Sequence, residues 1–323
     1  MMRIILNKIS AFGVLLSLNK LLKFSNKKIL CILYHTVNNN DSLHTKHLYL
    51  ARSKEQFIND LDYLQKHFNF ISSAQLAEGN YEATRPSIHL SFDDGMKECF
   101  KIIYPILKER KIPATFFINP AFIDNKQMFH CHKASLLKDT FLQDPNKYIA
   151  GKINLSGTPS IQKQPDQYYE ALAKRLNVNF DNYLLENEPY MRLSELQELA
   201  TTGFEFGAHT MTHPLLNDID DNDKVQEIAG SIKWIRDNRL LGHGYFAFPF
   251  HDIGITMNIF DTIKQQNVKL SFGTSELKDD AIPGHYHRIS FENSTVSAKR
   301  IIKEKLFKYI LLKIIGKNKI TRV

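Results

Sequence analysis

Short apolar runs alternate with amphipathic stretches along most of this 323-residue chain. In the stretch 55–67, Phe57, Leu61 and Leu64 recur at intervals of three and four residues, which places them on one face of a helix. The apolar runs predict strands at 29–34, 68–72, 87–92, 114–118, 204–208, 244–248, 268–272 and 287–290. Strands that alternate with helices of this length indicate an α/β fold with a mainly parallel sheet, and seven or eight such units would be enough to close a barrel.

One long stretch, 124–190, interrupts this alternation. It is polar and helix-leaning, with Gly157, Pro159 and Pro165 near its middle. We interpret it as a helical insertion beside the active face of the barrel, where it either shapes substrate access or only covers surface. The predicted organisation is an N-terminal basic amphipathic extension at 1–28, a barrel domain at 29–292 that contains the insertion, and a C-terminal basic amphipathic helix at 293–323.

Both ends of the chain are basic. Residues 1–29 hold six basic residues and no acidic one, and residues 299–323 hold nine basic residues against Glu304 alone. Because the whole chain carries +8, the part between the ends carries about −6, which argues against a nucleic-acid partner. The terminal helices could lie on an anionic membrane surface or pack on the body with their lysines in water, and the pattern leaves both open.

The ends also bear on the location of the protein. The apolar stretch 9–18 is too short to span a bilayer, and no small-x-small cleavage pattern of a secretory signal follows it. The cysteines are few and odd in number (Cys31, Cys99 and Cys131), which argues against a disulfide framework and for a reducing compartment. We therefore expect a cytoplasmic protein, peripheral at the inner membrane face if the ends bind lipid.

Chemically active residues follow three predicted strands, at the ends where parallel α/β folds place their sites. The first group is Ser-Phe-Asp-Asp-Gly at 91–95. Adjacent carboxylates repel each other, and a divalent cation bound by Asp94 would remove that penalty while Asp93 stays free to take a proton from water. The second group holds His209 and His213, which at this spacing would share one face of a helical turn and could hold one ion.

The third group, Tyr-Phe-Ala-Phe-Pro-Phe-His at 245–251, would by itself be read as core. Each group alone has an ordinary explanation, as a surface turn, as unrelated histidines or as packing. Together they supply one carboxylate and two imidazoles, which is the layout of a catalytic metal site with open positions for water and substrate. Thr210 stands where a zinc protease of the His-Glu-x-x-His type carries its glutamate, which argues against that chemistry.

In this order the three motifs resemble the polysaccharide deacetylases with a NodB-type domain. Tyr-His-Thr-Val at 34–37 and Ile-Pro-Ala-Thr-Phe-Phe at 112–117 are also similar to that family, so the likeness runs from about 29 to 291. The resemblance implies a distorted (β/α) barrel of the NodB deacetylase type. It further implies a metal-dependent hydrolase that removes the N-acetyl group from an amino sugar of a polysaccharide or of a lipid-linked glycan precursor.

Carried over residue by residue, the resemblance implies that Asp93 is the general base. Asp94, His209 and His213 would bind a divalent metal ion, which we expect to be zinc. The backbone N–H of Phe250 would help to hold the developing oxyanion.

The sequence departs from the family pattern at three points. Ala247 stands where many members carry an arginine that steadies the catalytic aspartate, and Arg288 is a candidate to replace its charge. The Asp/Trp motif of the family has no counterpart around 271–275. Its late histidine, the general acid, is matched only loosely at His285, so that His251, His285 and His287 all remain candidates.

Two other functions stay open at this point. Related barrels deformylate lipid-linked amino sugars or cleave O-acetyl esters, and the same attack by water would serve each. Alternatively, the missing motifs would fit a non-catalytic glycan- or membrane-associated module on the same fold, although the expected ligands and the base are all present.

Overall fold

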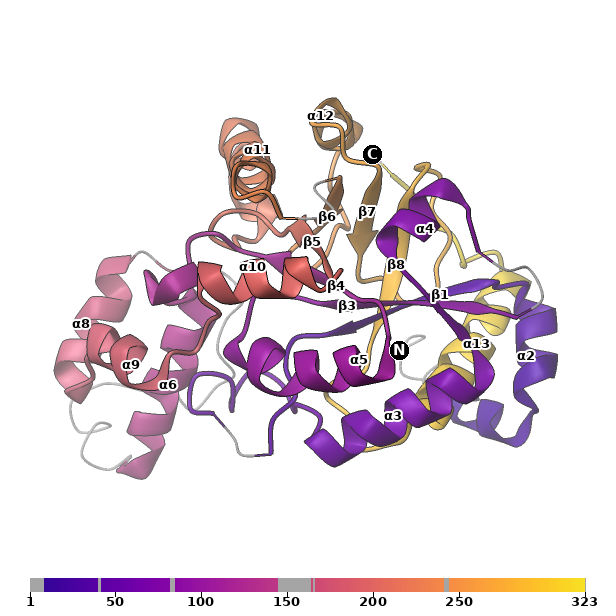
Figure 1. Ribbon diagram of the computed structural model, residues 1–323, viewed down its shortest axis with the longest axis horizontal. Helices are drawn as coiled ribbons and strands as arrows, with labels where there is room; N and C mark the ends of the chain where they lie inside the picture. The colour runs from indigo at the N-terminus through magenta and orange to yellow at the C-terminus, as the bar shows by residue number, and fades with distance from the viewer. Residues whose placement is uncertain are drawn as a thin grey trace.

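The computed structural model describes residues 9–39, 42–81, 85–144, 164, 166–240 and 244–322. Within them, eight parallel strands form one sheet (Figure 1). The strands are β1 (Ile29–Tyr34), β2 (Asn69–Ile71), β3 (Ser87–Phe92), β4 (Thr115–Ile118), β5 (Glu205–Ala208), β6 (Tyr245–Ala247), β7 (Leu270–Gly273) and β8 (His285–Ser290). Seven of these close a ring, because β1 pairs with both β8 and β3, and β2 is added beside the first half of β3. The predicted (β/α) barrel is confirmed, and every predicted strand overlaps an observed one.

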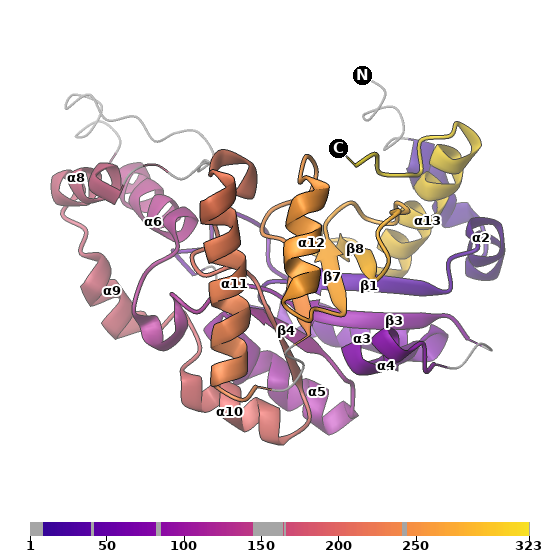
Figure 2. The same cartoon turned by 90° about the horizontal axis from the view of Figure 1, so that it is seen from above.

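Helices surround this ring (Figures 1 and 2). Two of them begin with a capping box, in which Ser53 and Ser72 exchange hydrogen bonds with the glutamine three residues later. The helical elements are η1 (Ala11–Leu15), α2 (Leu18–Ser25), α3 (Lys54–His67), α4 (Ser73–Glu78), η2 (Cys99–Ile103), α5 (Tyr104–Arg110), η3 (Ile123–Asn125), α6 (His130–Gln143), α8 (Asp166–Leu176), α9 (Phe180–Asn187), α10 (Leu193–Thr201), η4 (Leu216–Asp218), α11 (Asp221–Asp237), α12 (Met257–Gln265) and α13 (Ala298–Ile314).

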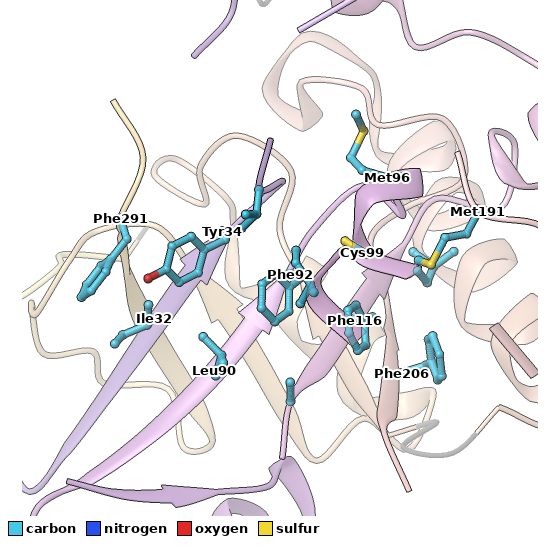
Figure 3. Packing of buried hydrophobic residues seen from close by; sticks show 14 of the residues in the cluster. Ile32, Tyr34, Leu90, Phe92, Met96, Cys99, Phe116, Met191, Phe206 and Phe291 are labelled. Carbon is cyan, nitrogen blue, oxygen red and sulfur yellow. The ribbon is translucent and has the colours of Figure 1, made fainter. Parts of the chain in front are cut away.

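The outer face of the barrel is lined by aromatic rings from consecutive strands. Tyr34, Phe92, Phe116 and Phe206 follow one another around β1, β3, β4 and β5, with ring centroids 5.2 to 5.8 Å apart (Figure 3). Such rings bury a large apolar area beneath the helices. Because side chains alternate along a strand, their neighbours in sequence point into the barrel.

The interior of the barrel contains both aromatic and polar side chains. Phe117 of β4 contacts Phe272 of β7 at 5.3 Å, although three strand pairings separate β4 from β7 in the sheet, so both rings point inward. His89 of β3 also stacks on Phe272. Gly207 leaves the room that the ring of Phe117 fills. This interior supports the residues that emerge at the carboxyl ends of the strands.

Two regions lie outside the barrel. The insertion contains α6, α8 and α9, as its helical pattern predicts; Gly157, Pro159 and Pro165 lie outside the described residues. At the opposite side of the barrel, α13 packs against η1, α2 and α3 (Figure 2). Lys303 of α13 donates to the carbonyl of Val14. The terminal helices therefore pack on the body and keep an exposed outer face. No helix in the described ranges is long and apolar enough to cross a bilayer.

Candidate metal centre and active site

Asp94, His209 and His213 meet at the carboxyl ends of β3 and β5. Nε2 of His209 lies 3.5 Å from Oδ1 of Asp94, and Nε2 of His213 lies 3.3 Å from the same oxygen. One ligand atom from each residue falls within 4.8 Å of the other two, and all three side chains are buried. The structure thus brings the three predicted ligands together.

The backbone around these residues adopts conformations that L-residues rarely use. Asp94, Thr210, His213 and Phe250 all have φ between 55° and 71°. Left-handed backbone at residues other than glycine is strained and tends to be kept at functional sites. Two of these residues break the path 209–213, so the predicted helical turn is wrong and the two imidazoles converge from a bent loop.

Two polar side chains hold this bent loop in place. The amide of Asn119, just after β4, donates to the carbonyl of His209 and, at 3.1 Å, to that of Thr210. From α11, the carboxylate of Glu227 accepts bonds from both the backbone N–H and the hydroxyl of Thr212, at 2.8 and 2.7 Å. Such bonds fix the direction in which metal-binding imidazoles point.

The donor set fits a divalent cation. Nδ1 of His209 donates to the carbonyl of Ala247 at 2.8 Å, which leaves Nε2 facing Asp94. Oδ1 of Asp94 and Nδ1 of His213 are buried without a hydrogen-bond partner among the described residues. Burial holds the pKa of His213 well below its usual value, so the ring is neutral, as a metal ligand must be. Burial raises the pKa of Asp94, a cost that a bound cation would remove.

Asp93 is held on the other side by Arg288. The guanidinium donates to both carboxylate oxygens of Asp93, with Nη1–Oδ1 and Nη2–Oδ2 distances of 2.7 and 2.8 Å. Arg288 lies inside the barrel over the rings of Phe117 and Phe272. Burial alone would raise the pKa of Asp93, but the charges of Arg288 and His209 and the hydrogen bonds from Arg288 together outweigh it, so the pKa is lowered. Arg288 therefore supplies a cation where Ala247 offers none.

A histidine–glutamate pair that we did not predict completes the cluster. Nδ1 of His35 lies 2.5 Å from Oε2 of Glu292, and Oε1 of Glu292 accepts bonds from the N–H groups of His35 and Thr36. Burial lowers the pKa of His35, but the charge and hydrogen bond of Glu292, together with the charges of Asp94 and Asp93, outweigh it and raise the pKa to about 10. The sequence feature that could have identified His35 as a site residue is its position directly after β1, in the Tyr-His-Thr-Val motif.

The three histidines that we predicted as candidates for the general acid, His251, His285 and His287, lie outside the cluster that contains Asp93 and His35. His285 and His287 lie on the face of β8 opposite Arg288, because side chains alternate along a strand. Nδ1 of His285 bonds Ser271 and Nε2 bonds Asp252, at 2.8 and 3.1 Å, so the structure does not bring His285 to Asp93.

His251 follows Phe250, whose ring contacts that of His213 at 4.5 Å. His251 is only partly buried and lines a different hollow, together with Ile253 and Tyr309.

The insertion borders the site through the start of α6. Phe129 contacts the ring of His213 at 4.5 Å, and His130 lies near Phe250. A cavity of about 480 Å³ extends from here along α8 and α9 and is lined by Thr212 of the loop 209–213, by His130 and by Phe180. The insertion therefore packs against His213 and Phe250 and borders a cavity next to the site.

Comparisons with known proteins agree with this geometry. The family model described as polysaccharide deacetylase matches residues 80–269. No curated protein sequence matched the chain. Among solved structures, the chain is similar to the Streptococcus pyogenes deacetylase PplD in complex with acetate, at 15% identity and a TM-score of 0.58, over 86% of this chain and 98% of that one.

Two further structures show the same fold. IcaB from Ammonifex degensii is 16% identical with a TM-score of 0.55, over 87% of this chain and 97% of that one. A de-N-acetylase from Aggregatibacter actinomycetemcomitans is 15% identical with a TM-score of 0.56, over 86% and 99%. With its family match over more than half of its length, the chain belongs to the polysaccharide deacetylases, which are hydrolases of carbon–nitrogen bonds other than peptide bonds in glycans.

Proposed function

We propose that this protein is a metal-dependent hydrolase that removes the N-acetyl group from an amino sugar. The observation that supports this most directly is the pairing of two carboxylates with different partners. Asp94 faces two imidazoles, whereas Asp93, next to it in sequence, is bound by Arg288 and stays available as a base. Zinc is the ion we expect, because an aspartate and two histidines suit its coordination.

When bound, the ion supplies Lewis-acid polarisation of the acetamide carbonyl and a water of lowered pKa. Asp93 takes the proton of the attacking water, and Arg288 keeps Asp93 ionised for that step. His35 carries a proton at neutral pH and donates it to the sugar nitrogen as the carbon–nitrogen bond breaks, while Glu292 orients its ring. The N–H of Phe250 helps to hold the oxyanion. Acetate and a free amine are the products.

The test is acetate release from N-acetylated saccharides by the purified chain with and without added zinc. We expect release that requires the metal and is lost in Asp93→Asn, which keeps the size of the side chain but cannot accept the proton. A panel of N-formyl, N-acetyl and O-acetyl substrates separates deacetylation from deformylation and ester cleavage. Failure of zinc-loaded protein to release an acyl group from any of these saccharides would overturn the proposal and favour a non-catalytic module.

We further propose that the protein rests on an anionic membrane at the cytoplasmic face and acts on a lipid-linked glycan. The support is a surface that we call the terminal surface, formed by η1, α2, α13 and the residues that flank these helices. It exposes the apolar residues Ile9, Phe12, Leu15, Phe24, Ile314 and Ile315 and the basic residues Lys20, Lys23, Lys28, Lys313 and Lys319. Apolar groups inserted among headgroups, with about 1 kcal/mol from each lysine near the surface, would give reversible binding.

Sedimentation with vesicles tests this surface. We expect binding to vesicles that contain phosphatidylglycerol and little binding to pure phosphatidylcholine. Leu15→Ser, at a side chain of 81% exposure, should weaken binding, whereas Leu185→Ser on α9, at 78% exposure, should not. Equal binding to both kinds of vesicle, or equal effects of the two substitutions, would contradict the proposal.

A further inference from the structure

A second group of metal-ligating side chains lies on the outer side of β8. Asp252, Asp280, His285 and His287 each offer one ligand atom, and these atoms all lie within 4.8 Å of one another. Nε2 of His285 is 3.1 Å from Oδ2 of Asp252, and Nε2 of His287 is 3.1 Å from Oδ2 of Asp280. Two carboxylates and two imidazoles form a complete ligand set for a four-coordinate divalent ion.

The guanidinium of Arg322 stands among these residues. Its Nη2 donates to Oδ2 of Asp252 and, at 2.5 Å, to Oδ2 of Asp280, and Nη1 donates to the carbonyl of Asp252 at 2.7 Å. The group also lies over the ring of Phe260, 4.7 Å from its centroid. A cation thus already occupies the place toward which both carboxylates point.

A single guanidinium does not match the cluster completely. It carries one positive charge, whereas Asp252 and Asp280 supply two carboxylates. Oδ1 of Asp252 is buried and has no hydrogen-bond partner in the described part of the chain. A buried carboxylate oxygen without a partner is costly, and a divalent ion would both balance the charge and supply that partner.

The backbone makes room for this cluster at Gly273, the last residue of β7. A Cβ atom there would lie 2.2 Å from Oδ1 of Asp252 and 2.7 Å from Nδ1 of His287. The φ of Gly273 is not in the left-handed region, so the strand does not need glycine for its conformation. The absence of a side chain is required by the approach of Asp252 and His287.

We propose that Asp252, Asp280, His285 and His287 form a second divalent cation site, for which zinc and Arg322 compete. The backbone N–H of Ser275 donates to Nδ1 of His287, so Nε2 carries the proton that now goes to Asp280. On zinc binding the ring changes tautomer, so that its proton moves from Nε2 to Nδ1, which lies 3.8 Å from Oδ1 of Asp252. Nε2 then binds the ion as a neutral ligand, and the guanidinium leaves. The site is separate from the proposed catalytic centre and does not depend on its activity.

Displacement of Arg322 would also affect the C-terminal segment that lies beside the terminal surface. The segment that carries Arg322 pairs with the β7–β8 loop through bonds from Asp279 N–H to Asn318 and from Ile320 N–H to Asp279, at 2.8 and 2.9 Å. Asp279 in turn accepts from the hydroxyl of Tyr309 on α13 at 2.7 Å. The ion at this site would therefore loosen a segment that is anchored beside the helices of the terminal surface.

The test is zinc stoichiometry by mass spectrometry after chelation and dialysis against buffered free zinc. We expect two ions for the native chain, one for Asp280→Asn and one for His213→Ala. Arg322→Met, which removes the competitor and keeps the ligands, should bind the second ion at least tenfold more tightly, and it decides the question if Asp280→Asn does not fold. One ion in the native chain that is lost in His213→Ala, with no second ion in Arg322→Met, would show that Arg322 is only a structural ion pair and overturn the proposal.

Discussion

Replacement of Arg288 by methionine should disable Asp93 without touching the metal ligands. The guanidinium makes two short bonds to Asp93 inside the barrel, and removal of one partner from a buried ion pair costs about 3–5 kcal/mol. With burial opposed only by His209 and His35, the pKa of Asp93 should rise, so that the ionised base is lost at a higher pH. We expect kcat/KM at pH 7 to fall by about 10²-fold and to recover partly as the pH is raised.

The assay is the pH dependence of kcat/KM for acetate release by the zinc-loaded protein, together with urea unfolding. The native Asp93 has a depressed pKa, so its stabilising contribution is present above about pH 4 and is lost as the pH falls through the folded value. The stability difference between native protein and Arg288→Met should therefore shrink in acid. Arg288→Lys, which keeps the charge but loses the two-pronged geometry, should be intermediate.

Arg52→Met is a matched control, because Arg52 is also buried and its Nε lies 3.2 Å from Oδ2 of Asp60. This ion pair is not part of the cluster around Asp93 and Asp94. It should cost comparable stability and leave the acidic limb of the pH profile in place. If folded Arg288→Met retained the native acidic limb, or if Arg52→Met shifted the limb equally, the assignment of Asp93 as a base held by Arg288 would be refuted.

Three further predictions follow from the site and its support. His35→Gln should lower kcat by about 10²-fold with little change in KM. In an NMR titration of the metal-free native protein, the His35 ring should keep its proton at neutral pH and lose it near pH 10. Its contribution to the stability of the fold should be lost as the pH rises through that value. Asn119→Ala should cost about 1–3 kcal/mol in urea unfolding and weaken zinc binding, because the loop that carries His209 loses its donor. Gly207→Ala should cost about 1–3 kcal/mol, since its Cβ would lie 2.4 Å from the ring of Phe117, while zinc binding per folded molecule stays unchanged.

The fold could be predicted largely because strands buried on both faces leave continuous apolar runs. The same holds for the places of Asp94, His209 and His213, since each follows such a run. The conformation of the loop 209–213 could not be predicted, because neither Thr210 nor His213 is a residue type that favours a left-handed backbone.

The pairing of His35 with Glu292 was also invisible, because the two residues are 257 positions apart and meet only when the barrel closes. The position of His287, one of the candidate general acids, could have been predicted from that of Arg288. If Arg288 points into the barrel toward Asp93, strand alternation directs His287 away from Asp93, so the sequence alone makes the two candidate roles mutually exclusive.

Along β8, Arg288 points into the barrel while His285 and His287 point outward, and this alternation limits which changes of register the strand can tolerate. A slip of one position would turn a guanidinium out against α12 and leave Asp93 without a countercharge, and it would turn two imidazoles into an aromatic interior. The strand is therefore locked by electrostatics as well as by shape. Insertions and deletions should be tolerated in the loops before and after it, but a single-residue deletion within it should abolish folding.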